Sequence, residues 1–156
     1  MGTPARAAQP RVDVQVASRL PGIPPPALFR RWIRAALAQP ATLTLRVVNA
    51  AEGRNLNSAF RGKDYATNVL TFVYHEPGAP ELLGDLVLCA PVVAREARQQ
   101  GKALADHYAH LTIHGALHLA GMDHERPRDA TRMEAREVAL LARFGIANPY
   151  PADAPG

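Results

Sequence analysis

The sequence predicts an α+β fold in a single domain, with a mixed four-stranded sheet packed against helices. Three observations lead to this prediction. The chain has 156 residues, the usual size of one compact domain. Its content of 47% hydrophobic and 21% charged residues is ordinary for a globular protein. Its periodic segments run in the order strand, helix, three strands and three helices, which is typical of a mixed sheet covered by helices.

The first part of the chain predicts a strand, a helix and a second strand. Residues 1–10 are rich in Pro, Ala and Arg and are expected to form a loose tail. Apolar and polar residues alternate over 12–16, which is the pattern of a half-buried strand. Pro26 suits the first turn of a helix, and the apolar face that follows predicts a helix ending near Pro40. The alternation over 42–49 predicts the second strand.

The middle of the chain predicts two more strands. Residues 50–68 are polar and contain Gly and Asn at several positions, so no regular structure is expected there. The more continuously apolar run at 69–74 predicts a third strand, central in the sheet. A turn region follows at 75–80, and the fourth strand is expected at 84–89.

The last part of the chain predicts three helices, over residues 91–100, 104–120 and 129–144. A glycine follows each of them, and glycine is the residue that most readily ends a helix. We expect one folded domain over 11–146 and a C-terminal tail over 147–156.

Composition excludes several classes of protein. No apolar run approaches the roughly 20 residues that span a bilayer, so no membrane partner is expected. The single cysteine, Cys89, excludes an intramolecular disulfide and a zinc site built on several thiolates. It indicates a reducing compartment, and the N-terminus lacks the apolar stretch of a secretory signal. The expected location is the cytoplasm.

The net charge of +4 comes with a strong preference for arginine, since only Lys63 and Lys102 of the 18 basic residues are lysine. One interpretation is a polyanionic partner, because guanidinium binds phosphate with two parallel hydrogen bonds. The other is a GC-rich genome, which favours Arg, Ala and Pro codons together. Composition does not decide between them. The basic helix face at 30–34 also has two interpretations. It could contact RNA backbone, or it could be a solvated helix face.

The strongest chemical signal is the spacing of three histidines, His114, His118 and His124. Residues four apart on a helix lie on one face, so His114 and His118 can approach one ion. Gly121 can end the helix and reverse the chain, which would bring back His124 as a third ligand. Three neutral imidazoles leave the fourth position of tetrahedral zinc open, as in catalytic sites. Chance placement is the alternative, and this spacing makes it the weaker one.

The spacing also matches the zinc-binding run of metzincin proteases, with one difference. Those enzymes have Glu directly after the first histidine, as general base. This chain has Gly115 there, so peptidase activity is not expected.

The run HGALHLAGMDH at 114–124 resembles the signature of the YbeY family, bacterial rRNA maturation factors proposed to be single-metal endoribonucleases. Three further stretches resemble the family in the same order: residues 56–72, residues 84–97, and the helix that contains Met133 and Glu134. One position departs from the family pattern, because the usual Thr-Asp before the third strand is Thr67-Asn68 here. Compared with the usual aspartate, the asparagine side chain at position 68 has the same size but no charge.

The resemblance implies a zinc-dependent endoribonuclease for single-stranded RNA, acting at the 3′ end of 16S rRNA and in ribosome quality control. One Zn²⁺ would be held by His114, His118 and His124. Arg61 would be catalytic as a clamp on phosphate, and Lys63 a weaker substrate contact. On the residues alone, a solvated loop arginine is the favoured interpretation of Arg61. The implied partners are ribosomal RNA, the small ribosomal subunit, one of its proteins and an assembly GTPase.

One alternative function remains at this point. It is a ribosome-assembly factor that works mainly by binding, with a structural metal.

The roles of His107 and His110, which precede His114 at helical spacing, are also undecided. They could support the metal ligands or contact RNA, or they could be ordinary packed or exposed helix residues.

Overall fold

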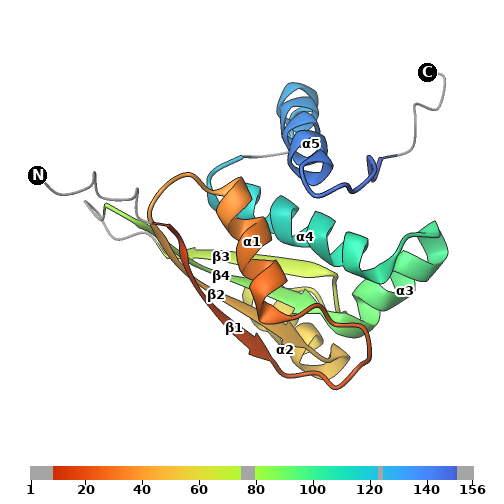
Figure 1. The fold of residues 1–156 in the computed structure, drawn as a ribbon. Coiled ribbons are helices and arrows are strands. Elements are labelled where there is room, and N and C mark those ends of the chain that lie inside the picture. Colours follow the sequence, from red (N-terminus) through yellow and green to blue (C-terminus); the bar gives the residue numbers. More distant parts are fainter. Residues whose placement is uncertain (1–8, 75–79, 123–124, 151–156) are drawn as a thin grey trace, which may run out of the picture.

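The computed structural model describes residues 9–74, 80–122 and 125–150. Within these ranges the chain forms four strands and five helices (Figure 1). In chain order they are β1 (Arg11–Val16), α1 (Pro26–Ala36), β2 (Ala41–Val48), α2 (Ala50–Arg61), β3 (Val69–Tyr74), β4 (Leu82–Cys89), α3 (Ala90–Gln100), α4 (Leu104–Leu119) and α5 (Pro127–Ala142). None of the helices in the described ranges has the length and apolar character needed to cross a membrane.

The strands form one mixed sheet in the order β1-β2-β4-β3. The first three are parallel, and β3 is antiparallel to β4. This arrangement confirms the predicted α+β class with a four-stranded mixed sheet. The expectation that the strand at 69–74 is central was wrong, because β3 lies at the edge. It is nevertheless apolar because α4 covers one of its faces while Leu70 and Phe72 pack with Leu56 of α2 on the other.

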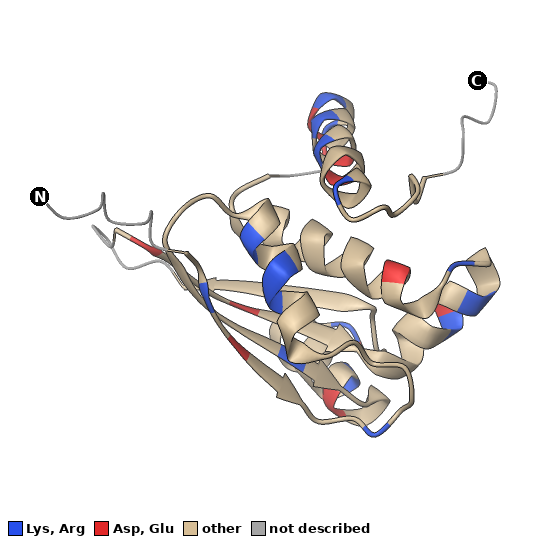
Figure 2. Ribbon diagram, viewed as in Figure 1, with Lys and Arg blue, Asp and Glu red and all other residues tan. Residues whose placement is uncertain are grey.

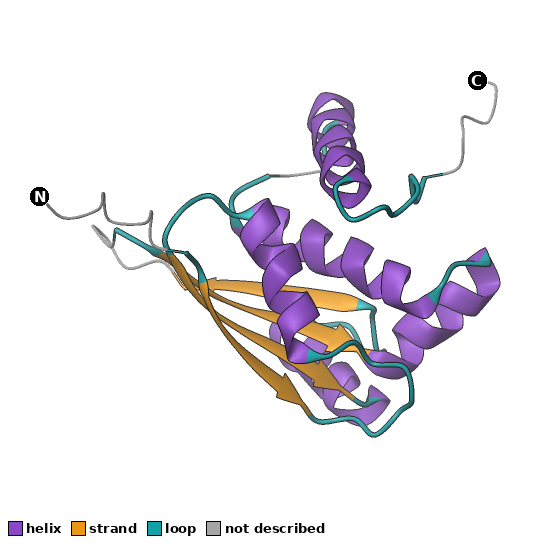
Figure 3. Ribbon diagram, in the orientation of Figure 1, coloured by secondary structure: helices purple, strands orange, loops and turns teal. Residues whose placement is uncertain are grey.

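Helices cover both faces of the sheet unequally (Figure 3). The main core lies between the sheet and α1 and α4, and it holds Phe29, Ile33, Leu45, Leu86 and Ile113, all fully buried. Helix α5 packs on the outer side of α4. Among the helices of the described ranges, α2 lies on the opposite face, over a smaller cluster that includes Cys89 and Val92 of α3. Cys89 is buried as expected, and burial raises the pKa of its thiol.

The segment expected to lack regular structure contains α2, so that expectation was wrong. Two of its glycine and asparagine residues, Gly53 and Asn57, lie inside the helix and serve packing. A Cβ on Gly53 would lie 3.1 Å from Cys89 Sγ, so the small residue lets α2 approach the sheet closely. Asn57 is buried and donates from Nδ2 to the Tyr65 carbonyl at 2.8 Å. Gly62 ends the helix with φ +68°, and Arg61 is thus the last helical residue and not part of a loop.

Figure 2 shows basic residues along α1, and their side chains contact the rest of the domain. Arg30 Nε donates to the Val12 carbonyl at 3.0 Å, and Arg34 Nε donates to the Pro10 carbonyl at 3.3 Å. The Arg31 guanidinium lies 5.6 Å from the centre of the Phe144 ring. These contacts give the face a structural role that neither sequence interpretation included.

Candidate metal centre

Helix α4 carries the two first histidines of the motif on successive turns. The ring centres of His114 and His118 are 6.0 Å apart. The helix is buried along most of its length, between the sheet on one side and α5 on the other. Both imidazoles are therefore held by a rigid element, as a metal ligand requires.

Hydrogen bonds orient both rings. His114 Nδ1 lies 2.9 Å from Glu137 Oε2, and His118 Nδ1 lies 2.9 Å from the Met122 carbonyl oxygen. These acceptors hold the proton on Nδ1 in each ring. Since the two nitrogens lie on opposite sides of an imidazole, each Nε2 is directed away from its acceptor. A carboxylate or carbonyl behind Nδ1 is the usual support of a zinc-ligating histidine, so the two residues fit a metal.

The predicted third ligand, His124, lies outside the described residues. Within the described ranges, no group of three His, Cys, Asp or Glu side chains has the arrangement of a metal site. The turn that leads toward His124 is described up to Met122, and it has the expected form. Gly121 has φ +100°, and the Met122 amide donates to the Leu117 carbonyl at 3.0 Å. This closes the end of α4 and turns the chain back.

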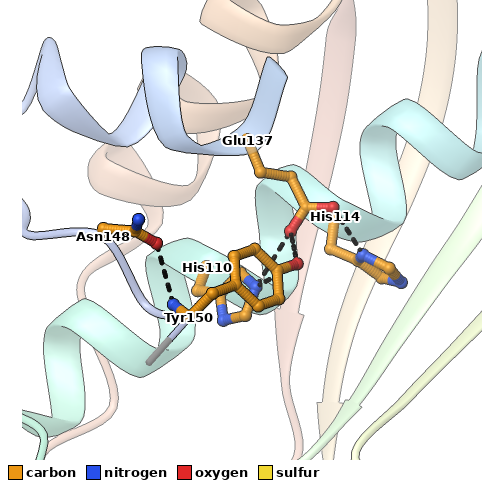
Figure 4. A network of polar contacts seen from close by, with 5 residues as sticks. All are labelled: His110, His114, Glu137, Asn148 and Tyr150. Carbon is orange, nitrogen blue, oxygen red and sulfur yellow. Dashed lines mark hydrogen bonds and ion pairs between the residues drawn. The ribbon is translucent and has the colours of Figure 1, made fainter. Parts of the chain in front are cut away.

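A buried carboxylate links α4 to α5 and to the C-terminal segment (Figure 4). The Glu137 side chain has no solvent exposure. Its Oε1 lies 2.9 Å from His110 Nε2 and accepts a hydrogen bond from the Tyr150 hydroxyl at 2.5 Å. Burial raises the pKa of Glu137, but the hydrogen bonds from His110, His114 and Tyr150 outweigh it and lower the pKa to about 2. Glu137 is therefore an anion at neutral pH.

Sequence reasoning missed Glu137 and Tyr150. A signal for Glu137 was available, because it shares the apolar face of the last helix with Met133, Leu140 and Leu141. A carboxylate among core positions requires partners. Tyr150 falls in the segment expected to be a tail, and the domain boundaries proposed from the sequence stay a prediction.

The two histidines face a cleft of about 610 Å³ between α4 and the edge strand. Val69, Thr71 and Val73 of β3 form one wall. Arg61 reaches this cleft from the end of α2 and donates from a terminal guanidinium nitrogen to the Thr71 carbonyl at 2.5 Å. The structure thus brings Arg61 together with His114 and His118. Lys63 is exposed and is not among the residues that line the cleft.

The structure explains why glycine follows the first histidine. A Cβ on Gly115 would lie 2.7 Å from Leu86 Cδ1 and 3.4 Å from Thr71 Cγ2. Helix α4 is pressed against the sheet at this point, so position 115 has no room for the glutamate that a metzincin protease carries.

The asparagine that departs from the family pattern has a defined partner. Asn68 Nδ2 donates to Glu96 Oε1 at 3.0 Å, and His107 Nε2 lies 2.9 Å from the same oxygen. An aspartate at 68 would place a second carboxylate beside Glu96. His107 is buried, and burial is the main cause of its lowered pKa. His107 and His110 are thus packed residues. His110 contacts the same Glu137 carboxylate as His114 does.

The fold and the site define the class of the protein as a single-domain α+β protein with a candidate metal-dependent hydrolytic centre. The chain belongs to the family described as Endoribonuclease YbeY, whose model matches residues 26–145. The resemblance noted in the histidine motif is therefore confirmed.

Curated relatives and a solved structure agree with this assignment. The chain is 55% identical over 140 residues to the Endoribonuclease YbeY of Thiobacillus denitrificans, covering 90% of this chain and 95% of that one. It is 60% identical over 127 residues to the protein of the same name from Aromatoleum aromaticum, covering 81% of each. The solution structure of TM1509 from Thermotoga maritima is similar in fold, with a TM-score of 0.53 and 22% identity over 92% of this chain and 98% of that one.

Proposed function

We propose that this chain is a zinc-dependent endoribonuclease that cleaves single-stranded RNA in the maturation of the 3′ end of 16S rRNA and in ribosome quality control. The observation that carries the proposal is that His114, His118 and Arg61 line one and the same cleft. The name of the relatives supports RNA as the substrate. The small ribosomal subunit, one of its proteins and an assembly GTPase are the proposed partners, in the cytoplasm.

One Zn²⁺ would be held by His114, His118 and His124. A bound divalent ion supplies Lewis acidity to a phosphodiester and to water. Glu137 and the Met122 carbonyl lie against Nδ1 of the first two imidazoles, which orients the rings and leaves Nε2 of each for a metal. Because position 115 is glycine and is crowded by Leu86, the chain offers no peptidase base next to His114.

Arg61 would bind the phosphate that is cleaved. Its guanidinium uses one contact on the Thr71 carbonyl and packs 5.2 Å from the centre of the Phe72 ring. A guanidinium has five N–H donors, so this anchoring leaves donors for phosphate oxygens. A fixed cation stabilises the charge that develops on a phosphoryl group during cleavage. The net charge of +4, with Lys63 nearby in the sequence, favours attraction of RNA backbone that weakens as salt rises.

The test is to measure zinc per chain by elemental analysis and single-turnover cleavage of a single-stranded RNA, with and without chelator. We expect about one zinc per chain in the native protein and loss of both zinc and cleavage in His114→Ala and His118→Ala. Arg54→Ala is a matched control, since Arg54 is exposed on the same helix as Arg61 and pairs with Asp64. Cleavage by a zinc-free His114→Ala protein would contradict the proposal. Normal rRNA in cells that contain only a folded, inactive variant would favour a binding role in assembly.

A further inference from the structure

A second hollow lies on the other face of the edge strand. It has a volume of about 530 Å³ and is lined by residues of β1 to β4 and α2, among them Phe60, Phe72, Tyr74 and Arg61. Side chains alternate between the two faces of a strand. Thr71 of β3 therefore faces the histidine cleft, while Phe72 and Tyr74 face the second hollow.

Arg61 is the residue that joins the two hollows. It lines both of them, and its guanidinium lies 5.2 Å from the centre of the Phe72 ring while it donates to the Thr71 carbonyl. The strand that separates the hollows is at the edge of the sheet, with no further strand beside it in the described residues. An extended chain could therefore pass over this edge from one hollow to the other.

The second hollow presents aromatic surface to solvent. Phe60 is 64% exposed and Tyr74 is 53% exposed. The ring centres of Phe60 and Phe72 are 5.2 Å apart with an angle of 67° between the planes, so the two rings form adjacent walls. Exposed aromatic rings beside a cation are the usual means by which proteins hold unpaired bases.

The charged groups of this hollow already have partners. Arg46 donates to both carboxylate oxygens of Glu52, at 2.6 and 2.9 Å. The Tyr74 hydroxyl donates to Asp85. Arg46 and Glu52 thus form an ion pair, and Asp85 is hydrogen-bonded to a hydroxyl. Beside these groups the hollow presents flat apolar faces above polar groups such as Gln15 and Thr44. A planar ring with hydrogen-bonding edges matches such a surface.

We propose that this second hollow binds one unstacked base of the RNA substrate, beside the phosphate that Arg61 holds in the histidine cleft. The inference rests on the proposed function and adds a base subsite to it. A base can enter only if it is unpaired, because pairing keeps it inside a duplex. Phe60 is the main stacking platform, and the bound strand crosses the sheet over β3.

The experiment uses the zinc-loaded protein and single-stranded oligoadenylate at low salt. Phe60→Trp places a reporter in the hollow, and we expect its emission to be quenched in stopped flow before cleavage. The same strand annealed to oligouridylate should not quench it. Phe60→Ala should weaken binding of the single strand by about tenfold. Tyr65→Ala is the control, because Tyr65 is 54% exposed yet lines neither hollow.

The outcomes separate this inference from the proposed function. If the native protein binds and cleaves RNA while Phe60→Trp is not quenched and Phe60→Ala binds normally, the base subsite is wrong and the nuclease stands. If the native protein does not cleave RNA, the proposed function fails, and quenching in Phe60→Trp then reports binding alone. Quenching by an arginine-rich peptide but not by RNA would overturn the inference in favour of a protein ligand. Thermal melting of each variant checks that it is folded.

Discussion

Glu137 Oε2 lies 2.9 Å from His114 Nδ1, and so a carboxylate on α5 orients an imidazole on α4. The same carboxylate holds His110 and the Tyr150 hydroxyl, so three segments of the chain meet at one buried anion. The orientation of a candidate metal ligand therefore depends on the packing of the last helix.

Replacing Glu137 by Gln is expected to weaken zinc binding by about ten- to a hundredfold. The amide brings a donor where His110 or His114 now finds an acceptor, so one of these rings loses its orientation. The measurement is competition for zinc with a chromophoric chelator. Glu134→Gln is the matched control, because Glu134 is exposed on the same helix. A folded Glu137→Gln protein with native zinc affinity would contradict the role given to this carboxylate.

Arg61→Ala is expected to lower the single-turnover rate of RNA cleavage by about a hundredfold without loss of zinc. The reason is that Arg61 lines the cleft but its contacts are to Thr71 and Phe72, not to the histidines. Arg61→Lys should recover only part of the rate, since lysine keeps the charge but not the bidentate geometry. Rate and zinc content are measured on the same samples. A native rate in Arg61→Ala would remove Arg61 from the mechanism.

Gly115→Ala is expected to destabilise the protein by about 1 to 2 kcal/mol, although alanine is the better helix former. The added methyl group would meet Leu86, which is fully buried. Urea denaturation gives the free energy of unfolding. Leu86→Ala alone should also destabilise, by about 2 to 5 kcal/mol. In the double variant the loss should be smaller than the sum, and strict additivity would show that the two positions do not compete for space.

The pair formed by Arg46 and Glu52 makes part of the stability depend on pH. The hydrogen bonds from Arg46 lower the pKa of Glu52 below its ordinary 4.5. A lowered pKa in the folded state means that the contribution is complete above the ordinary pKa and is lost as pH falls through the folded one. Since the side chains are 35% and 38% exposed, the contribution is below about 1 kcal/mol. The free energy of unfolding, measured by denaturation, should be higher for the native protein than for Glu52→Gln at about pH 6. This difference should shrink as the pH falls to about 3. An advantage that is constant over this range would contradict the assignment.

Local patterns were sufficient for most of the fold. Alternation placed β1 and β2, and glycines placed the ends of α3 and α4 within one residue. Helix α2 was not predicted because Gly53 and Asn57 are residues that usually break helices. Their presence in the helix is explained by their contacts with Cys89 and Tyr65, which the sequence does not reveal. The edge position of β3 was not predicted for a similar reason. An apolar run indicates that both faces of a strand are covered, but it does not indicate how many strands lie beside it.

The candidate site was predictable where its residues share one helix. The spacing of His114 and His118 placed both on one face of α4. Glu137 is 23 residues away from His114, and Tyr150 is 13 residues beyond Glu137, so their contacts depend on how α5 and the following segment pack. The approach of Arg61 to the histidines has the same origin, because α2 and α4 lie on opposite faces of the sheet and Arg61 reaches the cleft at the edge strand.

The contacts of Arg30 and Arg34 bear on how copies of this protein behave at high concentration. An unpaired strand edge is a template on which another chain can add a strand. At β1, guanidinium groups occupy the carbonyls of Val12 and Pro10, where a second molecule would need to donate. Self-association through this edge would first require both arginines to be displaced, which protects the sheet against growing into an aggregate.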